Sequence, residues 1–152
     1  PEHISTQYEG MDLEARAAQR PAYHVGIMSE AKPLRIAIGE DNTDLAQMVS
    51  MLIGLQPDLL CVGYAPTTSA LEALVEAHRP DACLIDLQLA DGSALPLIRH
   101  LRAAYPACRL VAFSGDGSTG LEPACLEAGC DALVRKDGRP MAVIEALRAG
   151  RR

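Results

Sequence analysis

Apolar and polar positions alternate in blocks along this chain. From Leu34 onward, short runs that are apolar at nearly every position alternate with longer segments in which apolar residues recur every three or four positions. Continuous apolar runs are typical of strands covered on both faces, and the wider spacing indicates helices with one buried face. The predicted strands cover residues 34–39, 59–65, 82–86, 109–113 and 131–135.

The segments between these runs carry helix signals. The first predicted helix, Asp44–Leu55, has an inner face made of Leu45, Met48, Val49 and Leu52. Ser69 with Glu72 forms a capping-box pattern that predicts the start of the second helix, which Pro80 ends. Further helices are predicted from Gly92–Ser93 through Tyr105, over Glu122–Ala128 with Gly129 as cap, and from Pro140 onward.

Five strands alternating with five helices predict an α/β fold with a doubly wound parallel sheet. The flavodoxin-like strand order 2-1-3-4-5, a common solution for such sheets, makes the first and third strands neighbours. Residues 34–152 form this predicted domain. Residues 1–33 are polar, lack sustained periodicity and are expected to be an extension, flexible or helical over Asp12–Gln19.

Charged and polar side chains follow the predicted strands at the same end. Asp86 closes the apolar run that begins at Ala82, and Glu40–Asp41 directly follow the first strand. Ser114 and Lys136 come directly after the fourth and fifth strands. Because parallel strands end at one edge of a sheet, these side chains are expected to surround one small pocket.

Three carboxylates in one pocket raise each other's pKa values, so a proton or a cation must accompany them. Carboxylate oxygens and waters are the ligands that Mg²⁺ prefers. Lys136 adds a fixed positive charge and Ser114 a rotatable donor, which are the groups needed to stabilise a transferring phosphoryl group. Asp86 is then the expected nucleophile and forms an acyl phosphate.

Each position has a structural alternative when taken alone. Glu40–Asp41 could cap the following helix, because its N-terminus favours negative charge. Ser114 and Lys136 could be ordinary residues of solvated turns. The joint pattern favours a site, since every one of these residues lies at the same end of its own strand.

Composition narrows the class of protein. The 152 residues carry 14 Lys and Arg against 20 Asp and Glu, a formal charge of −6, which argues against direct nucleic-acid binding. No apolar run approaches the roughly 20 residues needed to span a bilayer, and no signal-peptide pattern is present. The expectation is a cytoplasmic protein without membrane contact.

The cysteine pattern favours buried thiols over a metal site. The five cysteines include no Cys-x-x-Cys pair, and no His lies at metal-ligand spacing beside them. Small buried side chains in a reducing compartment are the favoured interpretation, and a redox role for Cys125 with Cys130 stays open. The cysteines are Cys61, Cys83, Cys108, Cys125 and Cys130.

Four motifs, in order, carry a family resemblance. They are Ile38–Asn42, Pro80–Gly92, Phe113–Gly115 and Ala128–Lys136. With them, residues 34–152 resemble a response-regulator receiver domain of two-component phosphorelay signalling. Lys136–Asp137 and the late segment Glu145–Gly150 are similar to receivers of the LuxR-type transcription-factor branch.

The resemblance implies that Asp86 accepts a phosphoryl group from a histidine kinase or phosphotransfer protein. Glu40, Asp41 and Asp86, with the backbone carbonyl of Gln88, would bind Mg²⁺ or Mn²⁺. Ser114 would turn toward the phosphoryl group and Lys136 would pair with it. The family acts as a signalling module with slow intrinsic phosphotransfer rather than as a turnover enzyme. Its output partner or second copy commonly binds a face that here comprises residues 122–128, 132–135 and 141–148.

Three departures from the family pattern matter. Leu133 stands where many receivers carry an aromatic residue that reports phosphorylation, Asp137 replaces a proline that often has a cis bond, and Ala90 replaces a loop proline. Leu133 supports an alternative, an interaction module that no longer relies on phosphorylation. A phosphohydrolase would typically carry a second Asp two residues after the nucleophile, where this chain has Gln88. The sequence leaves open whether an output domain follows Arg152.

Overall fold

The computed structural model describes residues 31–115 and 121–150. The helix expected over residues 12–19, and all but the first two residues of the loop that follows the fourth strand (114–120), lie outside these ranges. The elements are β1 (Leu34–Gly39), α2 (Thr43–Gly54), β2 (Leu59–Ala65), α3 (Thr68–His78), β3 (Ala82–Asp86), β4 (Gln88–Leu89), β5 (Gly92–Ser93), α4 (Leu95–Ala104), β6 (Arg109–Ser114), α5 (Leu121–Ala128), β7 (Ala132–Arg135) and α6 (Met141–Arg148).

The main sheet has the predicted topology. Its strands lie in the order β2-β1-β3-β6-β7 and all neighbouring pairs are parallel. In chain order these are the five predicted strands, so the order 2-1-3-4-5 is confirmed. The sequence did not predict the short antiparallel ribbon of β4 and β5, in which Gln88 pairs with Ser93 and Leu89 with Gly92. This ribbon delays the start of α4 to Leu95.

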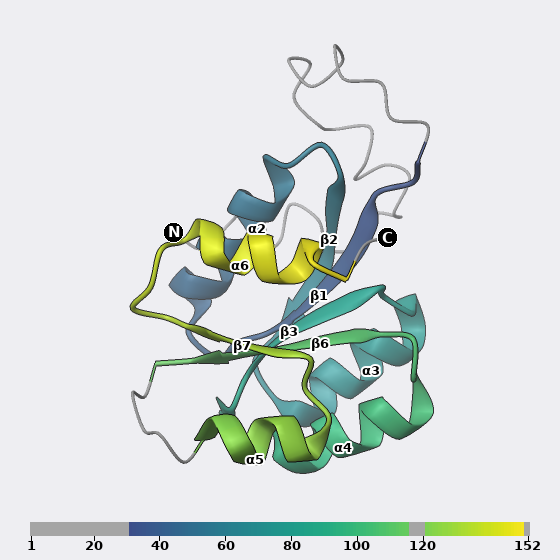
Figure 1. Ribbon diagram of the computed structural model, residues 1–152, viewed down its shortest axis with the longest axis vertical. Helices are drawn as coiled ribbons and strands as arrows, with labels where there is room; N and C mark the ends of the chain where they lie inside the picture. Colours follow the sequence, from purple (N-terminus) through teal and green to yellow (C-terminus); the bar gives the residue numbers. More distant parts are fainter. Residues whose placement is uncertain (1–30, 116–120, 151–152) are drawn as a thin grey trace.

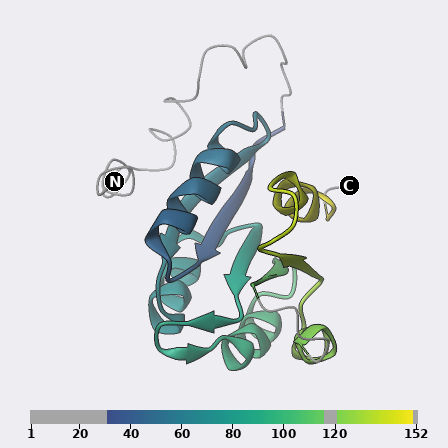
Figure 2. The same cartoon turned by 90° about the vertical axis from the view of Figure 1, so that its left-hand side faces the viewer.

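Helices cover both faces of the sheet, as the uniformly apolar strands require (Figures 1 and 2). On one face, α2 and α6 pack Val49, Ile53 and Ile144 against the outward residues of β1, β3 and β6. On the other face, α3, α4 and α5 bury Leu71, Ile98 and Cys125 in a second core. The sheet is therefore the middle layer of three, and its carboxyl edge stays free for a site.

The inner face of α2 differs from the prediction. Val49 is buried, and the other buried residues of α2 are Ala46, Gln47 and Ile53. Met48, predicted to face inward, is 54% exposed. The apolar stripe of α2 is wider than one face, because Met48, Met51 and Leu55 add exposed apolar side chains to the buried set.

The predicted capping box of α3 is wrong. Thr67 caps the helix, and its Oγ1 accepts a hydrogen bond from the Ala70 amide at 3.1 Å. Ser69 therefore lies in the first turn of α3 rather than at its cap, so Glu72 is too far along the helix to complete a capping box. The Glu72 carboxylate pairs instead with His100 on α4 at 3.1 Å.

Candidate functional site

The strand register brings the predicted residues to one edge of the sheet. Gly39 on β1 pairs with Ile85 on β3, so Glu40 and Asp86 are the next residues on neighbouring strands. Asp86 pairs with Phe113 on β6, and Ser114 pairs with Arg135 on β7. Ser114 and Lys136 therefore follow on the next two strands, as the topology predicts.

The three predicted carboxylates form one cluster. Oxygen atoms of Glu40, Asp41 and Asp86 all lie within 4.8 Å of one another. Glu40 and Asp86 are buried, whereas Asp41 is exposed. Such an arrangement offers hard oxygen donors with one side open to solvent, which fits Mg²⁺ or Mn²⁺.

Glu40 and Asp41 do not cap α2. The cap is Asn42, whose Oδ1 accepts a hydrogen bond from the Leu45 amide at 3.1 Å. The Asn42 amide in turn donates to Glu40 Oε2 at 3.2 Å, which fixes the glutamate side chain. The side-chain cap of α2 is therefore Asn42 and neither member of the acidic pair.

Lys136 bridges the two buried carboxylates. Its Nζ lies 2.5 Å from Glu40 Oε1 and 2.8 Å from Asp86 Oδ2. The ammonium also lies 5.3 Å from the centre of the ring of Phe113, a residue that the sequence pattern did not predict to be part of the site. Phe113 could have been found only from the strand register, in which it pairs directly with Asp86.

Burial and charge set the protonation of the cluster. Burial raises the pKa of Glu40 to about 7, against the lowering effects of Lys136 and the Asn42 amide, and Asp86 adds to the rise. For Lys136, burial lowers the pKa, but hydrogen bonds to Asp86 and Glu40 outweigh it and leave the pKa raised. Without a metal, the cluster therefore holds a charged lysine and a glutamate that is half protonated near neutral pH.

Ser114 lies one residue beyond Phe113, the register partner of Asp86, and Gln88 contacts Asp86 directly. The Ser114 carbonyl accepts a hydrogen bond from the Lys136 amide at 2.8 Å. The Gln88 amide donates to Asp86 Oδ1 at 3.1 Å, which keeps the first residue of β4 next to the carboxylate. The turn between β4 and β5 is anchored in addition by Asp91, which accepts from the Thr68 amide at 2.8 Å and from the Thr68 hydroxyl at 2.6 Å.

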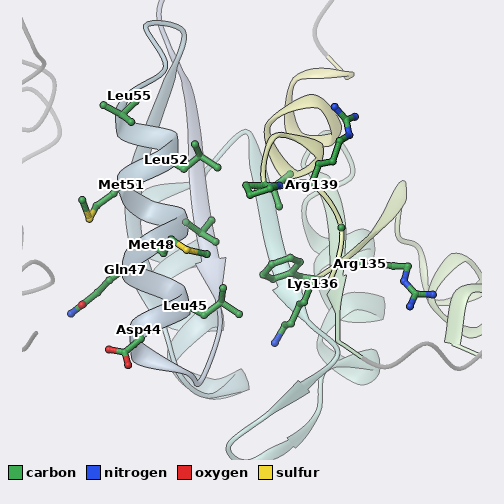
Figure 3. Close-up of a pocket in the computed structure, with 15 residues that line it drawn as sticks. Asp44, Leu45, Gln47, Met48, Met51, Leu52, Leu55, Arg135, Lys136 and Arg139 are labelled. Atoms are coloured by element: carbon green, nitrogen blue, oxygen red, sulfur yellow. The ribbon is translucent and has the colours of Figure 1, made fainter.

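A groove of about 400 Å³ adjoins this cluster. It runs between α2 and the segment that joins β7 to α6, and its walls are mostly apolar, including Met48, Leu52 and Val143. Figure 3 shows Leu45, Met48 and Leu52 on one side, with Lys136 and Arg139 across from them. Lys136 and Phe113 line the groove as well as the acidic site, so the two features are continuous.

The fold is thus a doubly wound parallel sheet with an acidic cluster and a lysine at its carboxyl edge. Residues 36–148 match the family described as the response regulator receiver domain. This match covers most of the chain, and the chain belongs to the response-regulator receiver family.

Relatives place the chain near one branch of that family. It is 30% identical over 120 residues to the nitrate/nitrite response regulator protein NarL of Escherichia coli (strain K12), which covers 79% of this chain and 56% of NarL. It is 28% identical over 115 residues to the DNA-binding transcriptional activator DevR/DosR of Mycobacterium tuberculosis, covering 76% and 53%. The chain thus spans about half the length of the curated relatives it matches.

Solved structures of receiver domains have the same fold as this chain. A LuxR-family two-component response regulator from Aurantimonas sp. SI85-9A1 superposes with a TM-score of 0.72 at 27% identity, covering 80% of this chain and 89% of the other. A CheY-like receiver domain protein from Methanospirillum hungatei JF-1 gives a TM-score of 0.71 at 21% identity, covering 78% and 93%, and shows the shared fold. Within residues 31–115 and 121–150, no helix is both long and apolar enough to cross a membrane.

Proposed function

We propose that this chain accepts a phosphoryl group on Asp86 from the histidine of a kinase or phosphotransfer protein, and that this switches a protein-interaction surface. The observation that carries the proposal is the bridge from Lys136 to both Asp86 and Glu40, with Asp41 completing an acidic cluster. The Lys136 ammonium neutralises two buried carboxylates and lies beside the proposed nucleophile at a solvent-facing edge. It is suited to a group that arrives with negative charge.

The nucleophile and two of the groups that neutralise phosphoryl charge are side chains of this chain. An Asp86 oxygen attacks phosphorus, the bond from phosphorus to the donor nitrogen breaks, and the donor imidazole departs with the electron pair. The Lys136 ammonium neutralises charge on the incoming phosphoryl oxygens, and the Ser114 hydroxyl donates to another. Glu40, Asp41, Asp86 and the Gln88 carbonyl would hold Mg²⁺ or Mn²⁺, which supplies further neutralisation of phosphoryl charge when bound.

Incubation with Mg²⁺ and a small acyl phosphate tests this function without a kinase. Intact-mass measurement should show one phosphoryl adduct per chain, and addition of a chelator before the donor should prevent it. Absence of any adduct in Mg²⁺ or Mn²⁺ would reject the proposed chemistry.

Binding of Mg²⁺ is expected to weaken as the pH falls through 7. The metal needs the Glu40 carboxylate, and a folded pKa of about 7 means that a proton must leave below that pH. Between about pH 8 and about pH 6, the apparent affinity should therefore fall roughly tenfold. Isothermal titration with MgCl₂ measures this change. Glu40→Gln should bind Mg²⁺ more weakly with a flat pH profile, and an equally steep profile in that variant would exclude Glu40 as the titrating group.

The groove beside α2 is the proposed contact for the protein that delivers the phosphoryl group. Such a protein must reach Asp86, and the groove shares Lys136 and Phe113 with that site. Met48→Asp should slow phosphorylation by a donor protein about tenfold, equivalent to about 1.4 kcal/mol of lost association energy. Phosphorylation by the small acyl phosphate should not change. Leu126→Asp, at an exposed position on α5, is the matched control. Equal slowing with both donors would contradict a docking role.

Leu133 supports a second candidate, a module that binds partners whether or not it is phosphorylated. The Leu133 side chain is partly buried and packs against the core under α3, α4 and α5. It cannot make the movement of an aromatic ring by which many receivers report phosphorylation. Partner binding that is identical for the wild type and Asp86→Asn would favour this candidate. The proposed output face, on α5, β7 and α6, is where binding should change if phosphorylation does matter.

A further inference from the structure

The C-terminal end of α5 holds two cysteines in a defined backbone motif. The Cys130 amide donates to the Cys125 carbonyl at 3.0 Å, and the Gly129 amide donates to the Leu126 carbonyl at 3.1 Å. Gly129 has a φ of +118°, which suits glycine at the residue that reverses the chain. These two hydrogen bonds define a Schellman motif, in which the side chains at the positions of Cys125 and Cys130 typically contact each other.

The two thiols interact directly. A hydrogen bond between them lowers the pKa of Cys125, and the same bond, with burial, raises the pKa of Cys130. Cys125 is fully buried and Cys130 is 7% exposed. The Schellman motif thus places the two coupled thiols next to each other, an arrangement that favours attack of one sulfur on the other after oxidation.

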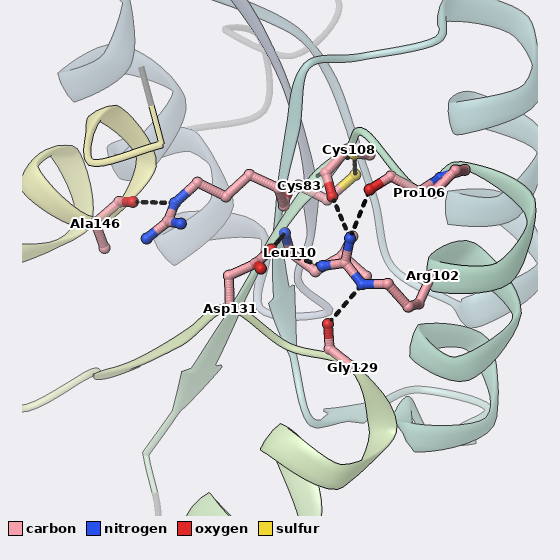
Figure 4. Close-up of polar contacts among 9 residues, drawn as sticks. Cys83, Arg102, Pro106, Cys108, Leu110, Gly129, Asp131 and Ala146 are labelled. Atoms are coloured by element: carbon pink, nitrogen blue, oxygen red, sulfur yellow. Dashed lines mark hydrogen bonds and ion pairs between the residues drawn. The ribbon is translucent and has the colours of Figure 1, made fainter. Parts of the chain in front are cut away.

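A guanidinium group is fixed over the same corner. Arg102 donates from Nε to the Gly129 carbonyl at 2.9 Å and from Nη2 to Asp131 Oδ2 at 2.6 Å (Figure 4). Its positive charge opposes the rise in the pKa of Cys130. Arg102 on α4 thus fixes the backbone between α5 and β7, independently of any bond between the cysteines.

A second thiol pair provides an internal comparison. The Sγ atoms of Cys83 and Cys108 lie 3.8 Å apart. Cys83 is in β3, and Cys108 is the residue directly before β6. Cys83 pairs with Leu110, two positions beyond Cys108. Strand spacing and rise then place their Cα atoms about 8 Å apart, beyond the reach of a disulfide without backbone movement. The contact between these two thiols is therefore not sufficient for a disulfide between Cys83 and Cys108.

We propose that Cys125 and Cys130 are a modification site, a dithiol that a hydroperoxide oxidises reversibly to an intramolecular disulfide. This inference is independent of phosphorylation at Asp86. The disulfide would close a six-residue loop that ties the last turn of α5 to the residue pair before β7. Because α5 is part of the proposed output face, oxidation would fix the end of one element of that face.

The chemistry balances with hydrogen peroxide as the oxidant. The Cys125 thiolate attacks one peroxide oxygen, the O–O bond breaks, and hydroxide leaves with the electron pair and takes up the proton that the thiol released. The sulfenic acid that remains on Cys125 is then attacked by the Cys130 sulfur, its S–O bond breaks, and a second water leaves. Two thiols and one peroxide give one disulfide and two waters. Because Cys125 is buried, the reaction requires opening of the short α5 helix end and is expected to be slow.

The test uses the full chain, fully reduced and then treated with hydrogen peroxide before alkylation of the remaining thiols. Intact mass should show the loss of two hydrogens with three alkylated cysteines, peptide mapping should join Cys125 to Cys130, and dithiothreitol should reverse the change. Cys125→Ser and Cys130→Ser should each abolish the linked product, whereas Cys83→Ser should retain it. A disulfide that maps to other cysteines would overturn the proposal, as would a wild type whose cysteines all remain alkylatable or that gains only oxygen.

Discussion

Asp86→Asn is expected to abolish the phosphoryl adduct completely, whether the donor is a small acyl phosphate or a phosphorylated protein. The amide that replaces the carboxylate cannot act as the nucleophile, so no acyl phosphate can form at this position. Intact mass after incubation with Mg²⁺ and the acyl phosphate measures the effect. The change is nearly isosteric, so loss of the adduct should not reflect loss of the fold.

The structure supports a matched control for this substitution. Asp44→Asn removes an exposed carboxylate from the first turn of α2, close to the site but outside the acidic cluster. It should retain the adduct at the wild-type level. Thermal unfolding should show Asp86→Asn within about 1 kcal/mol of the wild type, because Lys136 keeps Glu40 as a partner. An adduct that persists in Asp86→Asn would place the acceptor elsewhere.

The strands and their order could be predicted because the relevant information is local and repeated. Each strand is an apolar run, and a run such as Ala82–Ile85 can be buried on both faces only in a central sheet. Once right-handed crossovers fix the direction of the strands, the residues after each run must share an edge. Glu40, Asp86 and Lys136 are therefore expected to lie together, and the ion pairs among them agree with this expectation.

The features that the sequence did not reveal depend on contacts between distant residues. Periodicity cannot distinguish a buried Val49 from an exposed Met48 on an apolar helix, because the neighbouring elements decide which positions they cover. The start of α3 also depends on a distant residue, since Asp91 accepts hydrogen bonds from the amide and hydroxyl of Thr68, the first residue of the helix. The contact of Lys136 with Glu40, and the burial that raises the pKa of that glutamate to about 7, likewise require the folded arrangement.

Lys136→Met is expected to destabilise the metal-free protein by about 2–3 kcal/mol at about pH 8. It leaves the buried carboxylates of Glu40 and Asp86 side by side without their cation. The estimate lies below the ~3–5 kcal/mol typical of a broken buried pair, since Glu40 can take up a proton. Urea unfolding with excess chelator measures the loss.

The dependence on pH and metal separates this electrostatic cause from a loss of packing. The folded pKa of Glu40 is raised to about 7, so this glutamate is protonated at about pH 5.5. The two carboxyl groups then no longer repel each other, and the stability deficit of Lys136→Met should shrink. Saturating Mg²⁺ should reduce the deficit at about pH 8, because the metal supplies the missing positive charge. Arg139→Met removes an exposed cation from the same loop and should change stability by less than about 0.5 kcal/mol. If the deficit of Lys136→Met were the same at both pH values and with Mg²⁺, the stem of Lys136 rather than its charge would be responsible, and the electrostatic account of the site would fail.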